Sequence, residues 1–420
     1  MSNNDKKWYK LDNAGKIFPP TATRGDSKVF RFACELYEDV DKEILQAALD
    51  KTIEEYPLFL STLQKGLFWY YLETTSIKPK VREEDIALCD KMDDDLLFRV
   101  SYYKKRINLE VHHALTDGTG ALSFLKTLVT NYLSSKYSIK ENFVIDDSSI
   151  YEKEADSFEK YYKKSTKLKL PKDEKAYTLK GRKHLEDRLQ VIEGIVSTRD
   201  VLTLAKSHNT TVTIYLTSIL IQSVGSTMSR KEKRKPVVVT IPVNLRKYFK
   251  SNTARNFFST ITVSYKFKDD NDKIEDIIDA VSLQFKSKLT KENLDKQMNE
   301  LAVLENVFFI RLVPVFIKDI VLKYFHIKSR GEQTIALSNI GIVDMPKELQ
   351  QYIKLFDVFT STDCTQLCMC SYLDNMTLSF ASHFVDTEIQ KNFFTELSKQ
   401  NIDVVINTNI LEDSEYEEVL

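Results

Sequence analysis

The stretch that decides the expected fold reads His112-His113-Ala114-Leu115-Thr116-Asp117-Gly118. Residues 106–112 alternate between apolar and polar side chains, as in a strand with one buried face. If the alternation continues, His113 lies on the apolar face and His112 points away from it. From Gly118 onward the apolar residues recur at helical spacing as far as Leu133. The pattern predicts a strand–loop–helix corner, which is a common place for catalytic side chains.

Of the two histidines, His113 is the better candidate for chemistry. A neutral imidazole has an ordinary pKa near 6.5, so it can accept a proton near neutral pH. Asp117 either accepts the imidazole N–H or orders the loop by pairing with an arginine. Gly118 allows a backbone conformation that a Cβ atom would forbid. The alternative is a structural histidine beside a helix-capping aspartate.

A zinc site is a third interpretation of the histidine pair. Structural and catalytic zinc sites need three or four converging protein ligands. The sequence has no further cluster of histidine and cysteine with suitable spacing, and two neighbouring residues of a strand point to opposite sides. No metal is therefore expected.

Length and composition favour a globular protein of two domains. The 420 residues predict two domains of about 200 residues each. Acidic residues number 61 and basic residues 60, so no overall field attracts nucleic acid or an anionic membrane. The polar N-terminus lacks the apolar region of a signal peptide, and no apolar run reaches transmembrane length. With five cysteines, these features predict a cytoplasmic protein with reduced thiols, no nucleic-acid partner and no integral membrane segment.

Strand and helix patterns occur in both halves of the chain, which predicts α/β or α+β layering. The first half has a helix capped by Asp41, an aromatic strand Gly66–Leu72, and a hairpin of residues 96–103 and 106–112. The second half has a strand at 191–197, a short helix at 198–205, a buried helix over 211–224, further strands at 236–243, 334–337, 366–373 and 376–381, and mostly helix over 281–323. Residues 307–325 are interpreted as an amphipathic core helix, with contact to a membrane or a greasy acceptor as the alternative.

The polar, lysine-rich stretch after residue 134 divides the chain. We expect an N-terminal lobe over residues 1–150, a crossover linker over 151–185, and a C-terminal lobe over 186–420.

Several stretches, in the same order along the chain, resemble one protein family. They are His112–Gly118, Ile241–Arg246 with Asn256–Phe258, Leu337–Gly341, Leu11–Lys16 and Gly66–Tyr71. The first matches the HHxxxDG motif, and the others are similar to stretches such as PVDLR…RNFF and LSNxG of bacterial alcohol acetyltransferase-like proteins. The chain thus resembles the CoA-dependent acyltransferase superfamily, which includes chloramphenicol acetyltransferase and the condensation domains of peptide synthetases.

This resemblance implies two chloramphenicol acetyltransferase-like lobes, each a mixed sheet with helices, that meet at a V-shaped cleft with a central tunnel. It also implies an alcohol acetyltransferase-like activity with His113 as the catalytic base. The acyl group, acetyl as the first expectation, would pass directly from acyl-CoA to a small or lipophilic alcohol without a covalent acyl-enzyme. Acyl-CoA is then a co-substrate, and no cofactor stays bound.

The resemblance also suggests roles for residues around the base. Asp117 would pair with Arg246 from the other lobe and, together with Gly118 and His112, order the loop. The candidates for the oxyanion site or the tunnel wall are Ser338, Asn339 and Asn256. Asn244 stands where the family often has aspartate, which alters the local hydrogen-bond pattern but keeps Arg246.

Two other functions stay open at this point. One is an N-acyltransferase or condensation-type enzyme that takes its acyl group from a carrier protein in natural-product or lipid biosynthesis. The other is a non-catalytic protein that binds a carrier. The intact His113 counts against the second.

Overall fold

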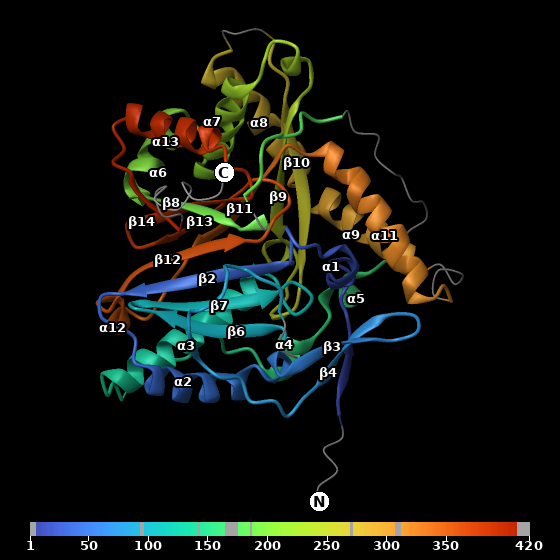
Figure 1. Cartoon of the computed structure of the whole chain (residues 1–420), viewed down its shortest axis with the longest axis vertical. Coiled ribbons are helices and arrows are strands. Elements are labelled where there is room, and N and C mark those ends of the chain that lie inside the picture. Colours follow the sequence, from blue (N-terminus) through green and yellow to red (C-terminus); the bar gives the residue numbers. More distant parts are fainter. Residues whose placement is uncertain are drawn as a thin grey trace, which may run out of the picture.

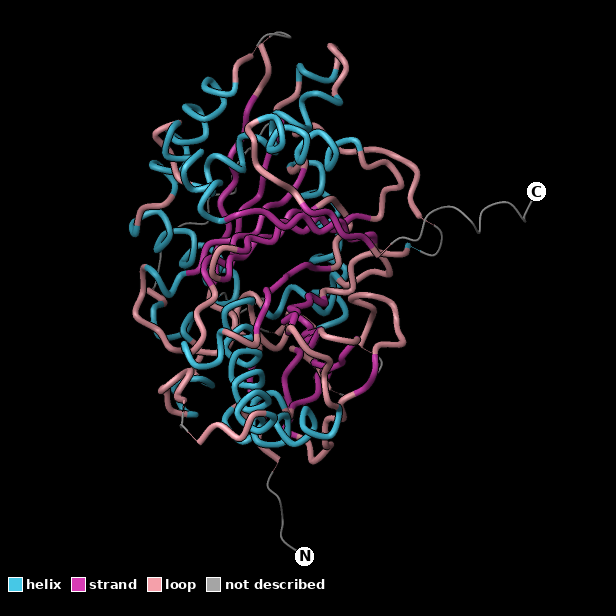
Figure 2. The backbone as a smooth tube through the Cα atoms, turned by 90° about the vertical axis from the view of Figure 1, so that its left-hand side faces the viewer, coloured by secondary structure: helices cyan, strands magenta, loops and turns pink. Residues whose placement is uncertain are grey.

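The computed structural model describes residues 6–92, 96–140, 143–163, 175–184, 187–268, 272–306 and 312–409. Two large sheets organise these residues, and Figure 2 places their strands in the middle of the molecule with helices toward the outside. The mixed sheets and their helices agree with the predicted α/β layering.

The sheet that carries the histidine loop has the strand order β12-β2-β7-β6-β5. Its strands are β12 (Ile353–Thr360), β2 (Val29–Leu36), β7 (Arg106–His112), β6 (Phe98–Tyr103) and β5 (Arg82–Glu83). β6 and β7 pair antiparallel, which confirms the predicted hairpin. β7 is the middle strand and ends where the loop of His113 begins, so the loop starts from a rigid, buried support.

Helices α2 (Lys42–Glu55) and α3 (Gly118–Lys136) pack against each other and cover this sheet (Figure 1). Asp41 caps α2, as predicted, because its carboxylate accepts a hydrogen bond from the Ile44 N–H. α3 begins at Gly118, also as predicted. Both helices share one apolar core with β2, β6 and β7, so the loop before α3 is held by buried elements on both sides.

The second large sheet has the strand order β10-β9-β11-β13-β14-β8-β15. Its strands are β8 (Gln190–Ser197), β9 (Val237–Asn244), β10 (Phe258–Tyr265), β11 (Ile335–Ile342), β13 (Gln366–Tyr372), β14 (Asn375–Ser382) and β15 (Val405–Thr408). The covering helices are α6 (Thr198–Ser207), α7 (Val212–Thr227), α8 (Ile274–Lys288) and α13 (Glu388–Lys399). α7 is buried along most of its length, which confirms the prediction for residues 211–224.

One strand joins the two halves of the chain. β12 comes from the C-terminal half, yet it pairs antiparallel with β2 in the N-terminal sheet. It also packs against β13 and β14 of the other sheet. Neither β2 nor β12 was predicted, because nearly all of their residues are buried on both faces and leave no clean alternation. The expected lobe boundaries at residues 150 and 186 stay a prediction, and residues 164–174 of the crossover lie outside the described residues.

The remaining described elements are short or peripheral. They are β1 (Trp8–Lys10), η1 (Gly15–Ile17), α1 (Phe18–Thr21), η2 (Pro57–Phe59), β3 (Ser61–Lys65), β4 (Tyr70–Thr74), α4 (Ile150–Glu154), α5 (Ser157–Tyr161), η4 (Glu232–Arg234), η5 (Leu245–Lys247), α9 (Lys291–Asn306), α11 (Val315–Ser329), η6 (Arg330–Glu332) and α12 (Lys347–Gln350). β1, β4 and β3 form a small separate sheet in that order.

Two expectations about local structure are wrong in part. The predicted strand Gly66–Leu72 is present only from Tyr70, where β4 begins. Gly66–Trp69 form the tip of a hairpin, where the Gly66 N–H donates a hydrogen bond to the Trp69 carbonyl oxygen at 3.0 Å and the Leu67 and Phe68 side chains are exposed. Residues 315–325 are helical, as predicted, but α11 is not a core helix because it turns most of its large apolar side chains to solvent. Residues 307–311 of this prediction lie outside the described residues.

The structure contains no described helix that is both long enough and apolar enough to cross a membrane.

A buried charged cluster connects the two large sheets. Arg106 of β7 donates two hydrogen bonds to the Glu193 carboxylate of β8, at 2.9 and 3.0 Å. Asp357 of β12 is fully buried, and its Oδ2 finds no donor among the described residues. Burial and the negative charge of Glu193 raise the pKa of Asp357 to about 8, although Arg106 opposes the shift. The protonated Asp357 carboxyl can donate to Glu193, so the cluster holds its proton near neutral pH.

The raised pKa makes folding stability depend on pH. The folded state binds the Asp357 proton more tightly than the unfolded state, so this stabilisation is complete below pH 4 and is lost as pH rises toward 8. Asp357→Asn keeps a donor toward Glu193 without a titratable proton. We expect the free energy of unfolding of the wild type to fall between pH 4 and 8 relative to the variant, by at most about 1.4 kcal/mol per pH unit. Urea unfolding across this range measures the difference, and parallel curves would contradict it.

Candidate active site

His113 lines a cavity of about 1000 Å³ built from both halves of the chain. The wall from the N-terminal half includes Phe18, Lys28, Phe30, Asp117 and Gly118. The wall from the C-terminal half includes Asn244, Phe258, Ser338, Asn339 and Cys368. His112 is buried and does not belong to the wall, so the two histidines separate in the way that the alternation of β7 predicts.

Aromatic rings surround the His113 imidazole. Phe18 stacks on it with ring centroids 4.7 Å apart, Phe30 lies at 4.4 Å, and Phe258 lies at 6.3 Å. The His113 backbone N–H donates to the Lys28 carbonyl oxygen at 2.8 Å. The ring nitrogen Nδ1 is enclosed and has no hydrogen-bond partner among the described residues. Packing therefore orients the ring, and Nε2 is the nitrogen left for a substrate.

Both histidines are neutral at physiological pH. Burial, with a smaller contribution from the neighbouring His112, lowers the pKa of His113 to about 3, although Asp117 opposes the shift. Burial and the charge of Lys28 lower the pKa of His112 to about 4. The His112 Nδ1 accepts a hydrogen bond from the Ala114 N–H at 3.0 Å, so it shapes the loop. His113 can accept a proton, whereas His112 already uses its acceptor.

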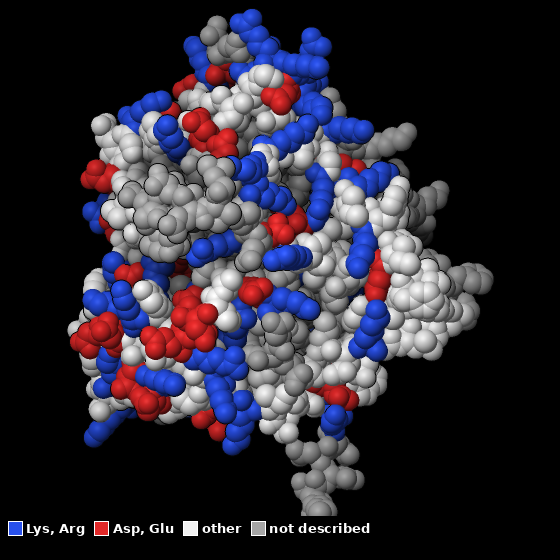
Figure 3. Space-filling model, viewed as in Figure 1, with Lys and Arg blue, Asp and Glu red and all other residues white. Residues whose placement is uncertain are grey.

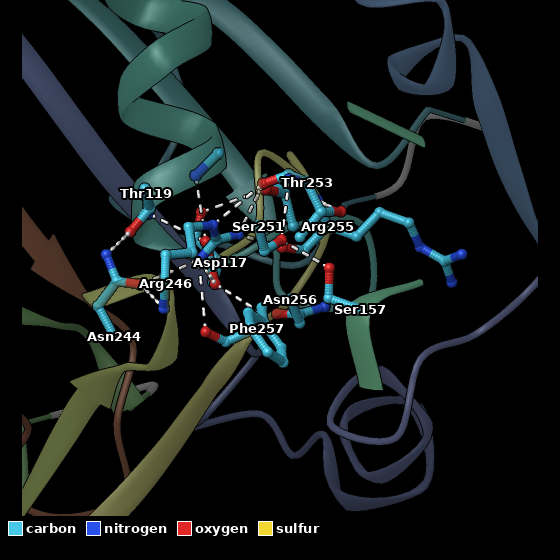
Figure 4. A network of polar contacts seen from close by, with 12 residues as sticks. Asp117, Thr119, Ser157, Asn244, Arg246, Ser251, Thr253, Arg255, Asn256 and Phe257 are labelled. Atoms are coloured by element: carbon cyan, nitrogen blue, oxygen red, sulfur yellow. Dashed lines mark hydrogen bonds and ion pairs between the residues drawn. The ribbon is translucent and has the colours of Figure 1, made fainter. Parts of the chain in front are cut away.

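Asp117 is the centre of a polar network at the junction of the two halves (Figure 4). Its Oδ1 caps α3 by accepting hydrogen bonds from the Thr119 and Gly120 N–H groups, both at 3.1 Å. Its Oδ2 accepts from Arg246 Nη1 and from the Phe257 N–H, both at 2.8 Å. The predicted ion pair between Asp117 and Arg246 is present, and both side chains are nearly buried.

Arg246 binds backbone carbonyl groups of the following residues as well as the Asp117 carboxylate. Its guanidinium donates to the carbonyl oxygens of Thr253 and Arg255, with distances from 2.6 to 3.1 Å. Asn244 accepts from the Arg246 N–H and donates to the Thr119 hydroxyl, each at 3.0 Å. The network therefore ties the start of α3 to residues 244–257 of the other half. No hydrogen bond joins the side chains of Asp117, Arg246 or Asn244 to the His113 imidazole.

Gly120, and not Gly118, is the position of the motif helix at which the fold requires glycine. Gly118 has no left-handed backbone conformation, so the expected reason for it is wrong. A Cβ there would come within 3.1 Å of the Ile340 side chain, which is close but flexible. At Gly120 a Cβ would lie 2.0 Å from the Ala254 carbonyl oxygen. The close approach of the two halves thus requires glycine at 120.

Asn256 supports the loop from behind and does not line the cavity. It is fully buried, and its side-chain amide donates to the His113 carbonyl oxygen at 3.0 Å and to Asp12 Oδ2 at 3.2 Å. Asp12 also accepts from the Gly15 N–H at 2.7 Å. Burial raises the pKa of Asp12 to about 6, although Arg255 opposes the shift. These contacts position the histidine loop.

Ser338 and Asn339 of β11 both line the cavity, but only the Asn339 side chain already makes hydrogen bonds with described residues. The Asn339 amide donates to the Thr213 hydroxyl at 2.7 Å, and its oxygen accepts from the Gly341 N–H at 2.8 Å. The Ser338 hydroxyl makes no hydrogen bond with a described residue. Of the two, Ser338 is the freer donor.

One group of potential metal ligands lies beside the His113 cavity, whose wall includes Asp26. Asp26, His326 and Asp363 bring their ligand atoms within 4.8 Å of one another. However, Lys28 pairs with Asp26 and Arg330 pairs with Asp363. Two cations therefore neutralise the carboxylates and disfavour a divalent ion at this position.

A second cavity has a volume of about 710 Å³. Its wall is rich in aromatic side chains, among them Trp8, Trp69, Tyr70, Phe158 and Tyr162. It shares no lining residue with the first cavity. Its wall also contains Asn13, the neighbour of the Asp12 that contacts Asn256, so a short chain of contacts leads from one cavity to the other.

Comparisons with known proteins place this architecture. No family model and no curated protein sequence matches the chain. The structure of TRI3 trichothecene 15-O-acetyltransferase from Fusarium sporotrichioides superposes with a TM-score of 0.63 at 12% identity, over 95% of each chain. TRI101 of F. graminearum, complexed with coenzyme A and deoxynivalenol, gives 0.64 at 10% identity, over 95% of this chain and 99% of that one.

The first condensation domain of the calcium-dependent antibiotic synthetase, in complex with a substrate analogue, gives a TM-score of 0.63 at 12% identity, over 95% of this chain and 99% of that domain. The chain has the fold shared by these acetyltransferases and the condensation domain. Within this fold, the pairing of β12 with β2 joins the C-terminal half of the chain to the N-terminal sheet.

The sequence did not point to several residues around the imidazole. Phe18 and Phe30 contact the ring, and Lys28 binds its backbone. Phe30 lies on β2, and the unpredicted strand explains why it was missed. Phe18 lies on a helix of four residues with two prolines, too short for any periodic signal.

Proposed function

We propose that this protein is an O-acyltransferase that moves an acyl group, acetyl as the first expectation, from acyl-CoA to an alcohol. The observation that carries the proposal is the neutral imidazole of His113 in a cavity that both lobes of an acyltransferase fold build. Nε2 removes the proton of the alcohol as its oxygen attacks the thioester carbonyl. The C–O bond forms, the C–S bond breaks, and the imidazolium returns the proton to the departing thiolate. The low pKa of His113 makes this second transfer favourable.

The charge of the cavity supports a polyanionic acyl donor. Lys126, Lys247 and Lys286 belong to its wall. The two aspartates of the wall, Asp26 and Asp117, are each neutralised by an ion pair. The cavity is therefore net positive, which suits the phosphates of coenzyme A. A structural neighbour, TRI101, is itself complexed with coenzyme A.

Ser338 is our candidate for stabilising the tetrahedral oxyanion. Its hydroxyl lines the same cavity as His113 and has no described partner to give up. A preorganised donor in such a site contributes about 3–4 kcal/mol to the transition state. Asn339, engaged by Thr213 and Gly341, is the second candidate.

A thiol-release assay tests the proposal. The protein is incubated with acetyl-CoA and a panel of short and long alcohols, and free coenzyme A is followed with a thiol reagent. We expect release that depends on the alcohol and disappears in His113→Asn. His208→Asn is the matched control, because His208 does not line the cavity and stacks on Tyr215. Release that needs no acceptor, or that survives His113→Asn, would overturn the proposal.

The same assay separates the other candidate functions. One structural neighbour is a condensation domain in complex with a substrate analogue. A donor bound to a carrier protein is therefore the second candidate. Activity only with amines, or only with an acyl group loaded on a carrier protein, would favour an N-acyltransferase or condensation-type enzyme. Tight binding of a loaded carrier without turnover would favour a non-catalytic protein.

The lowered pKa of His113 predicts the acid side of the pH profile. A base with an ordinary pKa would lose activity as pH falls through 6.5. His113 stays neutral until pH approaches 3, because burial disfavours its charged form. We expect kcat/KM to show no histidine-like loss between pH 7 and 5. A fall of about tenfold per pH unit below 6.5, in protein that stays folded by circular dichroism, would contradict this expectation.

A further inference from the structure

The outward face of α11 is apolar. Four of its side chains lie along one stripe at positions i, i+4, i+8 and i+11, with exposed fractions of 58% for Phe316, 66% for Ile320, 64% for Tyr324 and 65% for Ile327. The neighbouring residues Ile317, Val321 and Phe325 are exposed as well. Soluble proteins rarely expose a contiguous apolar surface of this kind without a binding partner.

The inward face of the same helix carries two charged side chains beside the buried Val315. Lys318 is buried and donates to the Phe68 carbonyl oxygen at 2.9 Å. Asp319 accepts from Lys65 Nζ and from the Tyr70 hydroxyl, both at 2.9 Å. These contacts fix the rotation of α11 about its own axis. The contacts of Lys318 and Asp319 therefore hold the apolar side of the helix toward solvent. An ordinary surface helix instead turns its apolar side toward the core.

The hairpin tip between β3 and β4 extends the apolar surface. The Val315 N–H donates to the Leu67 carbonyl oxygen at 2.8 Å, so the tip lies against the start of α11. The Leu67 side chain is 69% exposed, and Phe68 is also exposed. In Figure 3 a broad white surface covers the position of α11 at the right of the molecule, with Lys and Arg side chains along its inner border. We call α11 and the tip Gly66–Trp69 together the apolar ridge.

The charges of the apolar ridge are positive where they reach solvent. Lys323 and Lys328 are exposed on α11. The one acidic residue of the helix, Asp319, is already paired with Lys65. The net charge of the whole chain is −1, so this local arrangement is distinct from any overall field.

From this geometry we infer that the apolar ridge seats the protein on an anionic lipid bilayer. α11 has 15 residues and lies along the surface, with large apolar and aromatic side chains outward and lysines beside them, which is the composition of a helix that rests in the headgroup region. A symmetric contact with a second copy would bring the same lysines of both copies together, which is unfavourable. An anionic lipid surface attracts the lysines and takes up the apolar side chains at once.

Vesicle flotation tests the inference in the absence of any substrate, so its result is independent of the proposed acyl transfer. Vesicles of phosphatidylcholine with about 30% phosphatidylglycerol are compared with pure phosphatidylcholine. We expect wild-type protein to float with the anionic vesicles, and the triple variant Phe316→Ser, Ile320→Ser and Tyr324→Ser to bind about tenfold or more weakly. Lys323→Glu with Lys328→Glu is expected to remove the preference for anionic lipid.

The matched control is Leu283→Ser with Val405→Ser, which removes two apolar side chains of similar exposure, 71% and 60%, from α8 and β15. Control and wild type are expected to bind alike, with all variants unfolding at similar temperatures. The inference is overturned if the wild type does not bind anionic vesicles, or if the triple variant binds as the wild type does. It is also overturned if sedimentation shows a dimer that the triple variant abolishes while neither protein binds vesicles.

Discussion

Replacing His113 by alanine is expected to lower kcat by about 10²–10⁴-fold, with little change in folding stability beyond the loss of the ring contacts. The proposed reaction routes one proton from the alcohol to the thiolate through this imidazole. Its neighbours cannot substitute, because Phe18 and Phe30 carry no titratable group and the His112 Nδ1 already accepts the Ala114 N–H. Single-turnover rates with saturating acetyl-CoA and alcohol measure the effect on chemistry alone.

Binding of coenzyme A, followed by calorimetry, serves as the control for this first prediction. His113→Ala should bind coenzyme A with an affinity within a few-fold of the wild type, because the lysines of the cavity wall are untouched. The proposed role of His113 in proton transfer would be refuted if His113→Ala turned over at more than a tenth of the wild-type rate.

Replacing Asp117 by alanine is expected to destabilise the protein by about 3–5 kcal/mol, measured by urea unfolding. The change removes the cap of α3 and leaves the nearly buried Arg246 guanidinium without its carboxylate. Asp117 makes no hydrogen bond with the imidazole and acts on it only through its charge, so its loss should reduce activity chiefly by disturbing the loop. Activity per folded molecule should therefore fall less than in His113→Ala.

The control for Asp117→Ala is Lys6→Ala, which breaks a surface ion pair with Glu73. Pairs of this exposed kind contribute little, so we expect a change of less than about 1 kcal/mol. A stable Asp117→Ala protein that binds coenzyme A normally and has no activity would assign Asp117 a direct part in proton transfer.

Local patterns in the sequence were sufficient for part of the fold. The hairpin before His113 alternates between apolar and polar side chains, and Asp41 and Asp117 stand at helix starts, so these elements could be predicted. β2 and β12 could not, since strands buried on both faces resemble any other apolar run. Apolar spacing in α11 predicted a core helix, but spacing cannot tell which side of a helix meets the protein.

For the candidate site, the sequence indicated the residues of the motif but not their surroundings. The pairing of Asp117 with Arg246 followed from the resemblance, and the structure contains it. The aromatic enclosure of the imidazole comes from Phe18, Phe30 and Phe258, three segments far apart in the chain. Only the folded chain brings them together, and the low pKa of His113 depends on that enclosure.

The position of β12 also has a consequence for biosynthesis. β2 is made near the beginning of translation, and the strand that completes its sheet leaves the ribosome some 320 residues later. Until then one hydrogen-bonding edge of β2, with large apolar residues such as Phe30 and Phe32, has no native partner. The nascent chain must keep that edge from pairing with other strands, so chaperone binding during synthesis should concentrate on the segment Val29–Leu36.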